Sequence, residues 1–293
     1  MAKPTFLCIG AQRCGTTRLH RILSAHPEVL MTNSGVDKFE KEIHYFDRLV
    51  VDKPLSWYEN HFSTSSVTGE ITPAYSTLSD KVIADISRYL PEVRLIFIIR
   101  HPFERIWSQI CMMRSEWGRM GKMHPMDLMK LIEVAESPAV TLRSDYLRTI
   151  RNWKAFFPRD QLLVVRFEKL LQQEGLGQVL NHIGVNPNWC PPASKAEKVW
   201  SAVPADMPQE LRWWISLRWL EMIRDLYAWG ADIQDWVLEI EAQERLIPSS
   251  FRSQSLMLRR HAQKSNQQKW RDAVVRDDAV RHALHKRLLN PQN

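Results

Sequence analysis

The sequence predicts an α/β fold: a P-loop-like central parallel sheet flanked by helices, with a helical C-terminal region. An apolar run over Thr5–Gly10 is followed, four residues later, by Gly15 and an amphipathic segment. A second run, Val93–Ile99, is almost entirely apolar and rich in β-branched residues, as in the interior strands of parallel sheets. Strand-like and helix-like patterns then alternate, which favours a sheet whose ligands lie at the carboxyl ends of its strands.

The first helix is expected over Thr16–Ala25, because Leu19, Ile22 and Leu23 fall on one helical face. His26 precedes Pro27, and the residue before a proline disfavours the helical conformation, so the helix should end there. The other predicted elements are helices over Ser79–Tyr89, from Pro102 onward, over Tyr146–Phe157 and over Pro208–Trp229, and a strand over Gln161–Val165.

Composition is typical of a globular protein, with 44% hydrophobic and 25% charged residues in 293. The longest apolar runs, such as Leu95–Ile99, are strand-sized and too short to span a membrane. Residues Met1–Pro4 lead directly into the first strand without the apolar core of a signal peptide, so we expect cytoplasmic residence. The four cysteines show no C-x-x-C spacing and predict neither a zinc site nor a disulfide framework.

The net charge of +7 lies in the C-terminal segment, which holds 11 Lys and Arg residues against 4 Asp and Glu residues from Gln243 onward. Such a segment can bind nucleic acid, acidic lipid or another anionic ligand. A solvated helix face is the more ordinary explanation of the same pattern.

A phosphate-binding loop is predicted between Gly10 and Gly15, which frame the pattern G-x-x-x-x-G ahead of a helix. In such loops the backbone N–H groups and the helix N-terminus converge on an anion. A nucleotide kinase carries a lysine after the second glycine and uses magnesium, but here Thr16 takes that place and Arg13 is the nearby cation. A sulfuryl group carries one negative charge less than a phosphoryl group, so side-chain cations and amides suffice without a metal. The candidate binding residues are Gln12, Arg13, Cys14, Gly15, Thr16 and Thr17.

Arg100 and Ser108 form a second candidate site. Arg100 follows the strand over Val93–Ile99, and Ser108 lies eight residues later on the next predicted helix. A guanidinium fork and a hydroxyl group from consecutive elements can hold one phosphate between them. Taken alone, Arg100 would more often form a salt bridge at the end of its strand.

Together, the motifs I-G-A-Q-R-C-G-T-T-x-L-H and I-I-R-H-P-x-x-R-x-x-S resemble those of sulfotransferases that use 3′-phosphoadenosine 5′-phosphosulfate (PAPS). The resemblance covers about residues 5–240. It implies that the first motif wraps the 5′-phosphosulfate and that Arg100 and Ser108 hold the 3′-phosphate. We therefore expect a sulfotransferase domain over residues 1–242. Residues 243–293 are expected to form a basic, mostly helical extension packed on or near the same domain.

Further segments resemble the heparan-sulfate-type branch of that family, among them Lys41–Asp47 and Thr72–Tyr75. Glu42 falls where this branch places its catalytic base, which takes the proton from the attacking acceptor hydroxyl. Arg13 would stabilise charge on the leaving phosphate oxygen, and His44 is the alternative base. A salt bridge of Glu42 with Lys38 or Lys41 is the structural alternative.

The sequence departs from that branch in two places. Ile71 stands where those enzymes carry a lysine, and their lysine- and glycine-rich cofactor loop is not recognisable. Lys195 and Lys198, or Arg259 and Arg260, are candidates to replace that loop.

The acceptor therefore stays open among carbohydrate, lipid-linked sugar and natural-product alcohol or phenol, and no nucleic-acid partner is expected. Two alternative functions are a metal-dependent P-loop nucleotide kinase and a non-catalytic nucleotide-binding protein.

Overall fold

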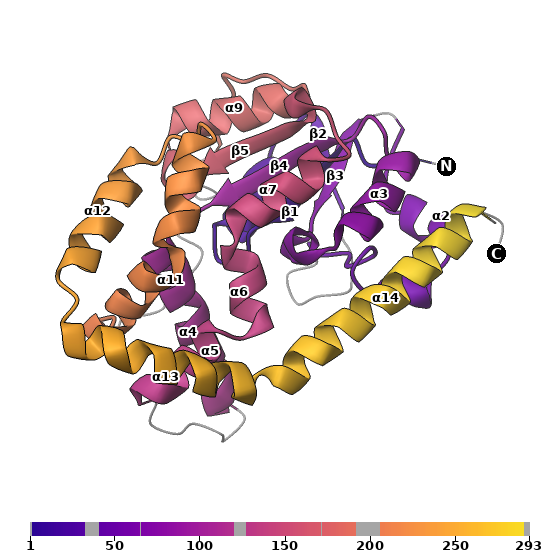
Figure 1. Cartoon of the computed structure of the whole chain (residues 1–293). Coiled ribbons are helices and arrows are strands. Elements are labelled where there is room, and N and C mark those ends of the chain that lie inside the picture. The colour runs from indigo at the N-terminus through magenta and orange to yellow at the C-terminus, as the bar shows by residue number, and fades with distance from the viewer. Residues whose placement is uncertain are drawn as a thin grey trace. The chain divides into compact units, whose positions relative to one another are not determined.

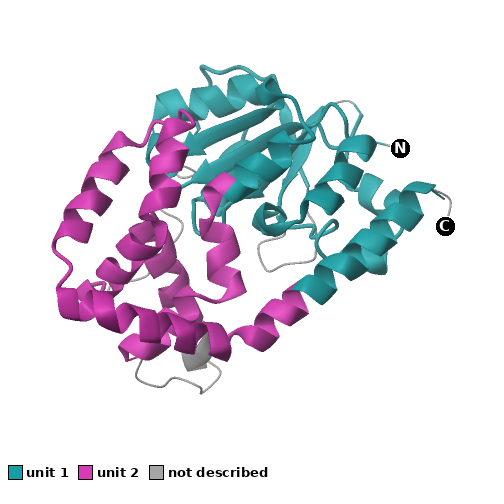
Figure 2. Ribbon diagram, in the orientation of Figure 1, with its two compact units in different colours: residues 1–100, 148–199, 274–293 teal, residues 101–147, 200–273 magenta. Residues whose placement is uncertain are grey.

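The computed structural model describes residues 2–32, 41–64, 66–119, 127–170, 172–191 and 206–289. The chain divides into two compact units (Figure 2). The first comprises Met1–Arg100, Arg148–Val199 and Val274–Asn293, and the second comprises His101–Leu147 and Trp200–Ala273. The basic C-terminal segment is thus shared between the units, and a domain boundary after residue 242 stays a prediction.

A five-stranded parallel sheet forms the core of the first unit (Figure 1). Its strands, in the spatial order β2-β3-β1-β4-β5, are β1 (Phe6–Gly10), β2 (Val29–Met31), β3 (Val67–Ile71), β4 (Arg94–Ile99) and β5 (Leu162–Arg166). The predicted parallel sheet is confirmed. β4 is an interior strand between β1 and β5, and its residues from Leu95 to Ile99 are buried, in agreement with its continuous apolar pattern.

Two strands, β2 and β3, were not predicted from the sequence. β2 has three residues, too few to show a period. In β3, the polar side chains of Thr68 and Glu70 interrupt the apolar run, yet both are fully buried. Apolar periodicity therefore could not mark β3, because its buried face is partly polar.

The α-helices that lie wholly or mostly in the first unit are α1 (Thr16–Leu23), α2 (Leu55–Glu59), α3 (Asp80–Tyr89), α7 (Tyr146–Lys154), α8 (Phe167–Leu170), α9 (Gln173–Ile183) and α14 (Gln267–Leu289). Short 3₁₀ turns occur at η1 (Leu49–Val51), η2 (Pro73–Thr77) and η3 (Arg159–Gln161). α9 packs on β4 and β5, and α7 crosses in front of the sheet in the view of Figure 1. α1 and α7 are shorter than predicted, because each ends in turns before the next strand.

The second unit is helical in its described part, with α4 (Pro102–Arg119), α5 (Leu128–Ala135), α6 (Pro138–Ser144), α11 (Gln209–Ala228), α12 (Gln234–Arg245) and α13 (Ser249–Ser265). The tryptophan-rich helix α11 packs against α4, α5 and α12, and Trp214 and Trp219 are buried there. On α4 the fully buried Arg105 donates hydrogen bonds to the Ser144 hydroxyl and the Val140 carbonyl of α6. Pairing each of these donors removes the large cost of an unsatisfied buried guanidinium.

Within the described residues, we find no helix that combines the length and the apolar character needed to cross a membrane. Cytoplasmic residence stays a prediction.

Candidate active site

The strands of the parallel sheet present their carboxyl ends at one edge. β1, β4 and β5 lead there into the predicted phosphate loop, into Arg100 and into Phe167 of α8, respectively. β3 leads into Thr72 and the turn η2. Segments far apart in sequence therefore converge, as expected for a ligand site of an α/β fold.

The phosphate loop has a backbone suited to an anion. Arg13 and Gly15 both adopt left-handed conformations, with φ of 69° and 86°. Gly15 is the N-cap of α1, and Thr16, which is 4% exposed, is the first helical residue. The first N–H groups of a helix have no partner within the helix, and the helix dipole adds partial positive charge at that end. The loop can therefore bind a phosphate group through the backbone.

Phe167 and Arg100 fix the shape of this loop from outside. A Cβ atom on Gly15 would lie 2.5 Å from the Phe167 ring, so the ring occupies the space that any larger residue would need. The Arg100 guanidinium stacks over the same ring, 4.9 Å from its centroid. Arg100 also donates a hydrogen bond of 3.2 Å to the Arg13 carbonyl. Arg100 thus supports the phosphate loop, although it is 87 residues from Arg13 in the sequence.

We expect Gly15→Ala to weaken nucleotide binding at least about tenfold, because the added methyl group meets both an unfavourable φ and the Phe167 ring. Isothermal titration with 3′-phosphoadenosine 5′-phosphate measures the change. Gly184→Ala is the matched control, since Gly184 also has positive φ (85°) but its Cβ would meet open space. Equal loss of binding in the two variants would contradict a specific role of the Phe167 contact.

A charged cluster lies in the segment that joins β2 to α2. Lys41, only 2% exposed, donates a hydrogen bond from Nζ to Oε1 of Glu42. His44 Nε2 lies 3.1 Å from Glu42 Oε2, and its Nδ1 lies 3.0 Å from both carboxylate oxygens of Asp47. An imidazole that faces a carboxylate at each nitrogen is best satisfied when both nitrogens carry a proton. The cluster is therefore a chain of alternating charges, Lys41–Glu42–His44–Asp47.

The electrostatics of the cluster distinguish the two candidate bases. Burial acts to raise the pKa of Glu42, but the hydrogen bond from His44 and the charge of Lys41 outweigh it and hold that pKa at about 2. Burial acts to lower the pKa of His44, but its hydrogen bonds to Asp47 and Glu42 prevail and raise the pKa to about 9. At neutral pH, Glu42 is ionised and can accept a proton, whereas the protonated His44 cannot.

We expect His44 to make folding stability fall as pH rises toward 9. Its folded-state pKa exceeds the unfolded value of 6.5, so its contribution is complete below 6.5 and is lost as pH rises through about 9. Urea unfolding at pH 6.0 and 9.5, compared between the parent chain and Asp47→Asn, measures the effect. The variant removes one partner of His44 and should flatten the pH dependence. An unchanged slope would contradict the Asp47–His44 interaction.

Glu70 of β3 is a fully buried carboxylate that accepts three hydroxyl hydrogen bonds. Tyr58 and Tyr75 donate to its Oε1 at 2.7 and 3.0 Å, and Thr72 donates to its Oε2 at 2.6 Å. Burial raises the pKa of Glu70 to about 7, although the three hydrogen bonds act in the opposite direction. Glu70 therefore holds the side chains of Tyr58, Thr72 and Tyr75 in fixed orientations.

Two of those hydroxyl groups position the backbone of the charged cluster. The Tyr75 hydroxyl accepts the N–H groups of Tyr45 and Phe46 at 3.0 and 3.3 Å. The Thr72 hydroxyl accepts the N–H of His44 in a longer contact of 3.5 Å. Glu70 thus positions the segment that carries Glu42 and His44 without being one of the charges in the cluster.

The cluster lies close to the strand that leads into the phosphate loop. The N–H of Thr72 donates to the Cys8 carbonyl of β1 at 3.1 Å. Burial raises the pKa of the Cys8 thiol to about 12, and the charges of Lys41 and Glu42 also act on that thiol. The charged cluster therefore lies beside β1, the strand that leads into the phosphate loop.

The C-terminal helix α14 also contacts this region. Arg287 donates from Nε to the Val50 carbonyl at 2.7 Å and from Nη2 to the Val51 carbonyl at 3.3 Å. These carbonyls belong to η1, whose backbone N–H groups bond back to His44 and Tyr45. α14 therefore caps η1, the turn that follows the charged cluster in the chain.

Residues 4–189, which include the phosphate loop, the charged cluster and Arg100, match the family model for sulfotransferases. The chain belongs to the sulfotransferase family. Human bifunctional heparan sulfate N-deacetylase/N-sulfotransferase 3 is 27% identical over 204 residues, which cover 64% of this chain and 23% of that protein. Human heparan sulfate glucosamine 3-O-sulfotransferase 5 is 27% identical over 180 residues, 58% of this chain and 49% of that protein. The chain thus spans a quarter to a half of the length of these relatives.

The fold is also that of a solved family structure. The crystal structure of a sulfotransferase from Alicyclobacillus acidocaldarius is similar with a TM-score of 0.62 and 18% identity, over 80% of this chain and 99% of that one. At this identity the likeness supports the fold alone. It agrees with the α/β class predicted from the sequence.

The structure brings most of the predicted site residues of this family member to one edge of the sheet. Gln12 to Thr17 form the loop, Arg100 supports it, and Glu42 pairs with His44 and with Lys41. Ser108 lies on α4 of the second unit, so its pairing with Arg100 stays a prediction. Lys195 and Lys198 lie outside the described residues. In the described ranges no group of three or more His, Cys, Asp and Glu side chains is arranged to hold a metal, and the expected metal independence stays a prediction.

Sequence reasoning missed four residues that shape the site: Asp47, Glu70, Phe167 and Arg287. Asp47 was visible within the Lys41–Asp47 motif but had no assigned role. An acidic residue inside the buried strand β3 was the available signal for Glu70. Phe167 and Arg287 carry no local signal, since their roles depend on contacts with distant segments.

Proposed function

We propose that this chain transfers a sulfuryl group from PAPS to a hydroxyl group of a carbohydrate. The observation that carries this proposal is the ionised Glu42, held between Lys41 and a protonated His44 next to the strand that opens the phosphate loop. Family membership and the heparan sulfate sulfotransferases among its relatives favour a glycan acceptor. These relatives are longer proteins than this chain.

The loop fits the phosphosulfate end of PAPS. The backbone is left-handed at Arg13 and Gly15. The Phe167 ring leaves no room for a side chain at Gly15, so a ligand there would meet the backbone itself. The N-terminal N–H groups of α1 and the Thr16 and Thr17 hydroxyl groups are the donors available there. When bound, PAPS supplies the sulfuryl group that is transferred. Arg100, with Ser108, is the proposed contact for the 3′-phosphate.

The residues of the cluster have distinct proposed roles. Glu42 accepts the proton of the acceptor hydroxyl as the oxygen attacks sulfur. His44, protonated and fixed by Asp47, orients the Glu42 carboxylate and is thereby disfavoured as the base. Lys41 adds positive charge beside Glu42, and Arg13 stabilises negative charge on the leaving phosphate oxygen. The pKa of about 2 keeps Glu42 ionised at neutral pH, which is the state that can accept a proton.

Incubation with ³⁵S-labelled PAPS and a panel of glycans, lipid-linked sugars and natural-product alcohols tests the proposal. We expect label to appear in a glycan product without added magnesium. Magnesium-dependent turnover of ATP with no sulfuryl transfer would instead establish a nucleotide kinase. Nucleotide binding with no transfer to any acceptor class would favour the non-catalytic alternative.

A further inference from the structure

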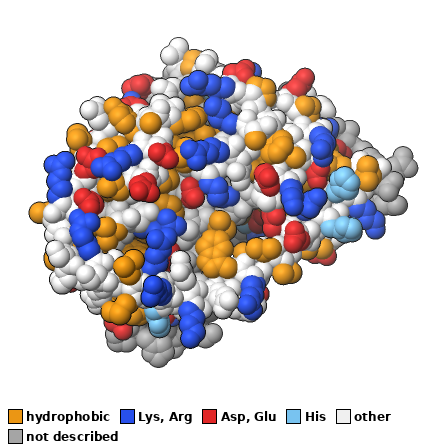
Figure 3. Space-filling model, in the orientation of Figure 1, with side chains coloured by type: hydrophobic (Ala, Val, Ile, Leu, Met, Phe, Trp, Pro, Cys, Tyr) orange, Lys and Arg blue, Asp and Glu red, His pale blue; other side chains and the backbone are white. Residues whose placement is uncertain are grey.

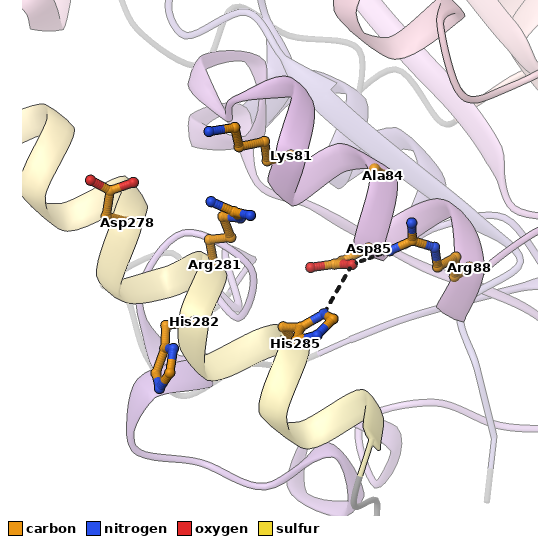
Figure 4. A pocket seen from close by; sticks show the side chains of 8 residues that line it. All are labelled: Lys81, Ala84, Asp85, Arg88, Asp278, Arg281, His282 and His285. Atoms are coloured by element: carbon orange, nitrogen blue, oxygen red, sulfur yellow. Dashed lines mark hydrogen bonds and ion pairs between the residues drawn. The ribbon is translucent and has the colours of Figure 1, made fainter.

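Helices α3 and α14 enclose a groove on the first unit that the proposed chemistry does not use. Its volume is about 620 Å³, within the usual range of small-ligand sites. The lining residues on α3 are Lys81, Ala84, Asp85 and Arg88, and those on α14 are Asp278, Arg281, His282 and His285 (Figure 4). Both sets follow the spacing i, i+3, i+4, i+7, so each is one stripe of its helix. The small side chain of Ala84 lies in the middle of the α3 stripe and leaves the space open.

The groove is built by specific anchors. Asp277 of α14 accepts the N–H of Ser79, the N-cap of α3, at 3.2 Å. Val280 and Leu284 are the buried residues of α14, and Arg287, near the C-terminal end of this helix, bonds to η1. These anchors follow one stripe of α14, and the groove-lining residues follow the adjacent stripe. The two stripes that line the groove are therefore held facing each other.

The charges in the groove are unevenly compensated. Asp85 pairs with Arg88 at 2.6 Å and lies 3.8 Å from His285. Lys81 and Arg281 extend into the same space from opposite helices (Figure 4). Among the described residues, no ion pair to either side chain is found. With Asp85 and Asp278, the lining holds three Lys and Arg side chains against two carboxylates. An anion placed near Lys81 and Arg281 would balance this excess of one positive charge.

Figure 3 shows the same region as a mixed surface: on the side of α14, basic, acidic and histidine side chains gather together. A nucleic acid is bound by a broad surface of one charge, which this groove does not offer. A sulfate or carboxylate group on a sugar needs two or three donors, which Lys81 and Arg281 can supply between them. The groove therefore suits a ligand whose anionic groups are spaced by neutral, hydroxyl-bearing parts.

We propose that this groove binds an anionic segment of the acceptor glycan, such as a sulfated sugar, at a site separate from the catalytic cluster. The proposal rests on the proposed function and narrows its acceptor to a chain that already carries sulfate or carboxylate groups. α14 connects the two sites, because Arg287 caps the turn beside the cluster while Arg281 and His285 line the groove. A longer acceptor would then be held at two places on one unit.

The test measures binding of a fluorescent heparin hexasaccharide to the full chain, next to its desulfated counterpart. We expect the sulfated probe to bind at least about tenfold more tightly, and Arg281→Glu to remove about tenfold of its affinity. Arg276→Glu is the matched control, since it makes the same charge change on an exposed residue of α14 outside the groove. It should alter affinity less than about twofold. Ala84→Gln, which fills the groove without changing charge, should weaken binding as Arg281→Glu does.

Equal losses in Arg281→Glu and Arg276→Glu, or equal binding of both probes, would overturn the groove proposal. So would full competition by inorganic sulfate at the concentration of the probe, which would indicate a site for the free ion. Titration with 3′-phosphoadenosine 5′-phosphate in each variant reports on the nucleotide site separately. Loss of probe binding in Arg281→Glu, in a chain that shows no sulfuryl transfer, would support the groove and reject the proposed function. Normal sulfuryl transfer to short acceptors, without binding of the probe to the groove, would support the proposed function and reject the groove proposal.

Discussion

Replacing Glu42 by glutamine should lower kcat by about 10²–10⁴-fold, the usual contribution of a positioned general base. The amide keeps the size of the side chain and can still contact Lys41 or His44, but it has no basic oxygen for the acceptor proton. Binding of 3′-phosphoadenosine 5′-phosphate should stay within about twofold, since the loop at Arg13–Thr17 is untouched. Single-turnover transfer from labelled PAPS separates the chemical step from product release.

Glu174→Gln is the control for this substitution, because Glu174 is an exposed residue of α9 in the same unit. It should retain full activity. If Glu42→Gln kept at least half of the parent rate, Glu42 would not be the base, and His44 would have to be reconsidered. If the nucleotide no longer bound, the role of Glu42 would be structural.

Removal of the Arg13 side chain should lower kcat/KM by about 10²–10³-fold, as when one charge-stabilising donor is deleted from other enzymes. Arg13 has φ of 69°, so Arg13→Gly is expected to relax the backbone and to raise stability by about 1 kcal/mol while activity is lost. Thermal unfolding and single-turnover rates together separate these effects. A folded, more stable and inactive variant would show that the guanidinium acts in catalysis.

Arg13→Lys is the decisive companion. It keeps the positive charge but loses the planar fork, so it should recover part of the rate. Activity in Arg13→Gly close to that of the parent would contradict any catalytic role of the side chain. Equal losses in Arg13→Lys and Arg13→Gly would show that bidentate geometry, rather than charge, is what the reaction requires.

The sequence was most informative where function depends on local pattern. The loop between β1 and α1 and the strand β4 before Arg100 could be read directly, because glycine spacing and a continuous apolar run have few structural meanings. The pairing of Glu42 with Lys41 was foreseen as an alternative to catalysis, whereas the structure shows that the ion pair forms part of the candidate site. Glu42 can therefore form a salt bridge with Lys41 and still serve as the proposed base.

Tertiary contacts account for what the sequence did not reveal. The Phe167 ring matters because it fills the space beside Gly15, and no periodicity records that contact across more than 150 residues. Glu70 supports the cluster through Tyr75 and Thr72, whose hydroxyl groups could equally have faced solvent. The state of His44 depends on having Glu42 and Asp47 on opposite sides of one ring. Such arrangements follow from three-dimensional packing and have no counterpart in local sequence.

The hydrogen bond from Arg287 to the Val50 carbonyl joins residues 237 positions apart. At the rate of about 5–20 residues per second typical of translation, roughly 10–50 s separate the synthesis of η1 from that of the arginine that caps it. The segment that carries Glu42 and His44 therefore leaves the ribosome long before its last support exists. The hydrogen bonds from α14 that support the candidate active site can therefore form only late in the synthesis of the chain.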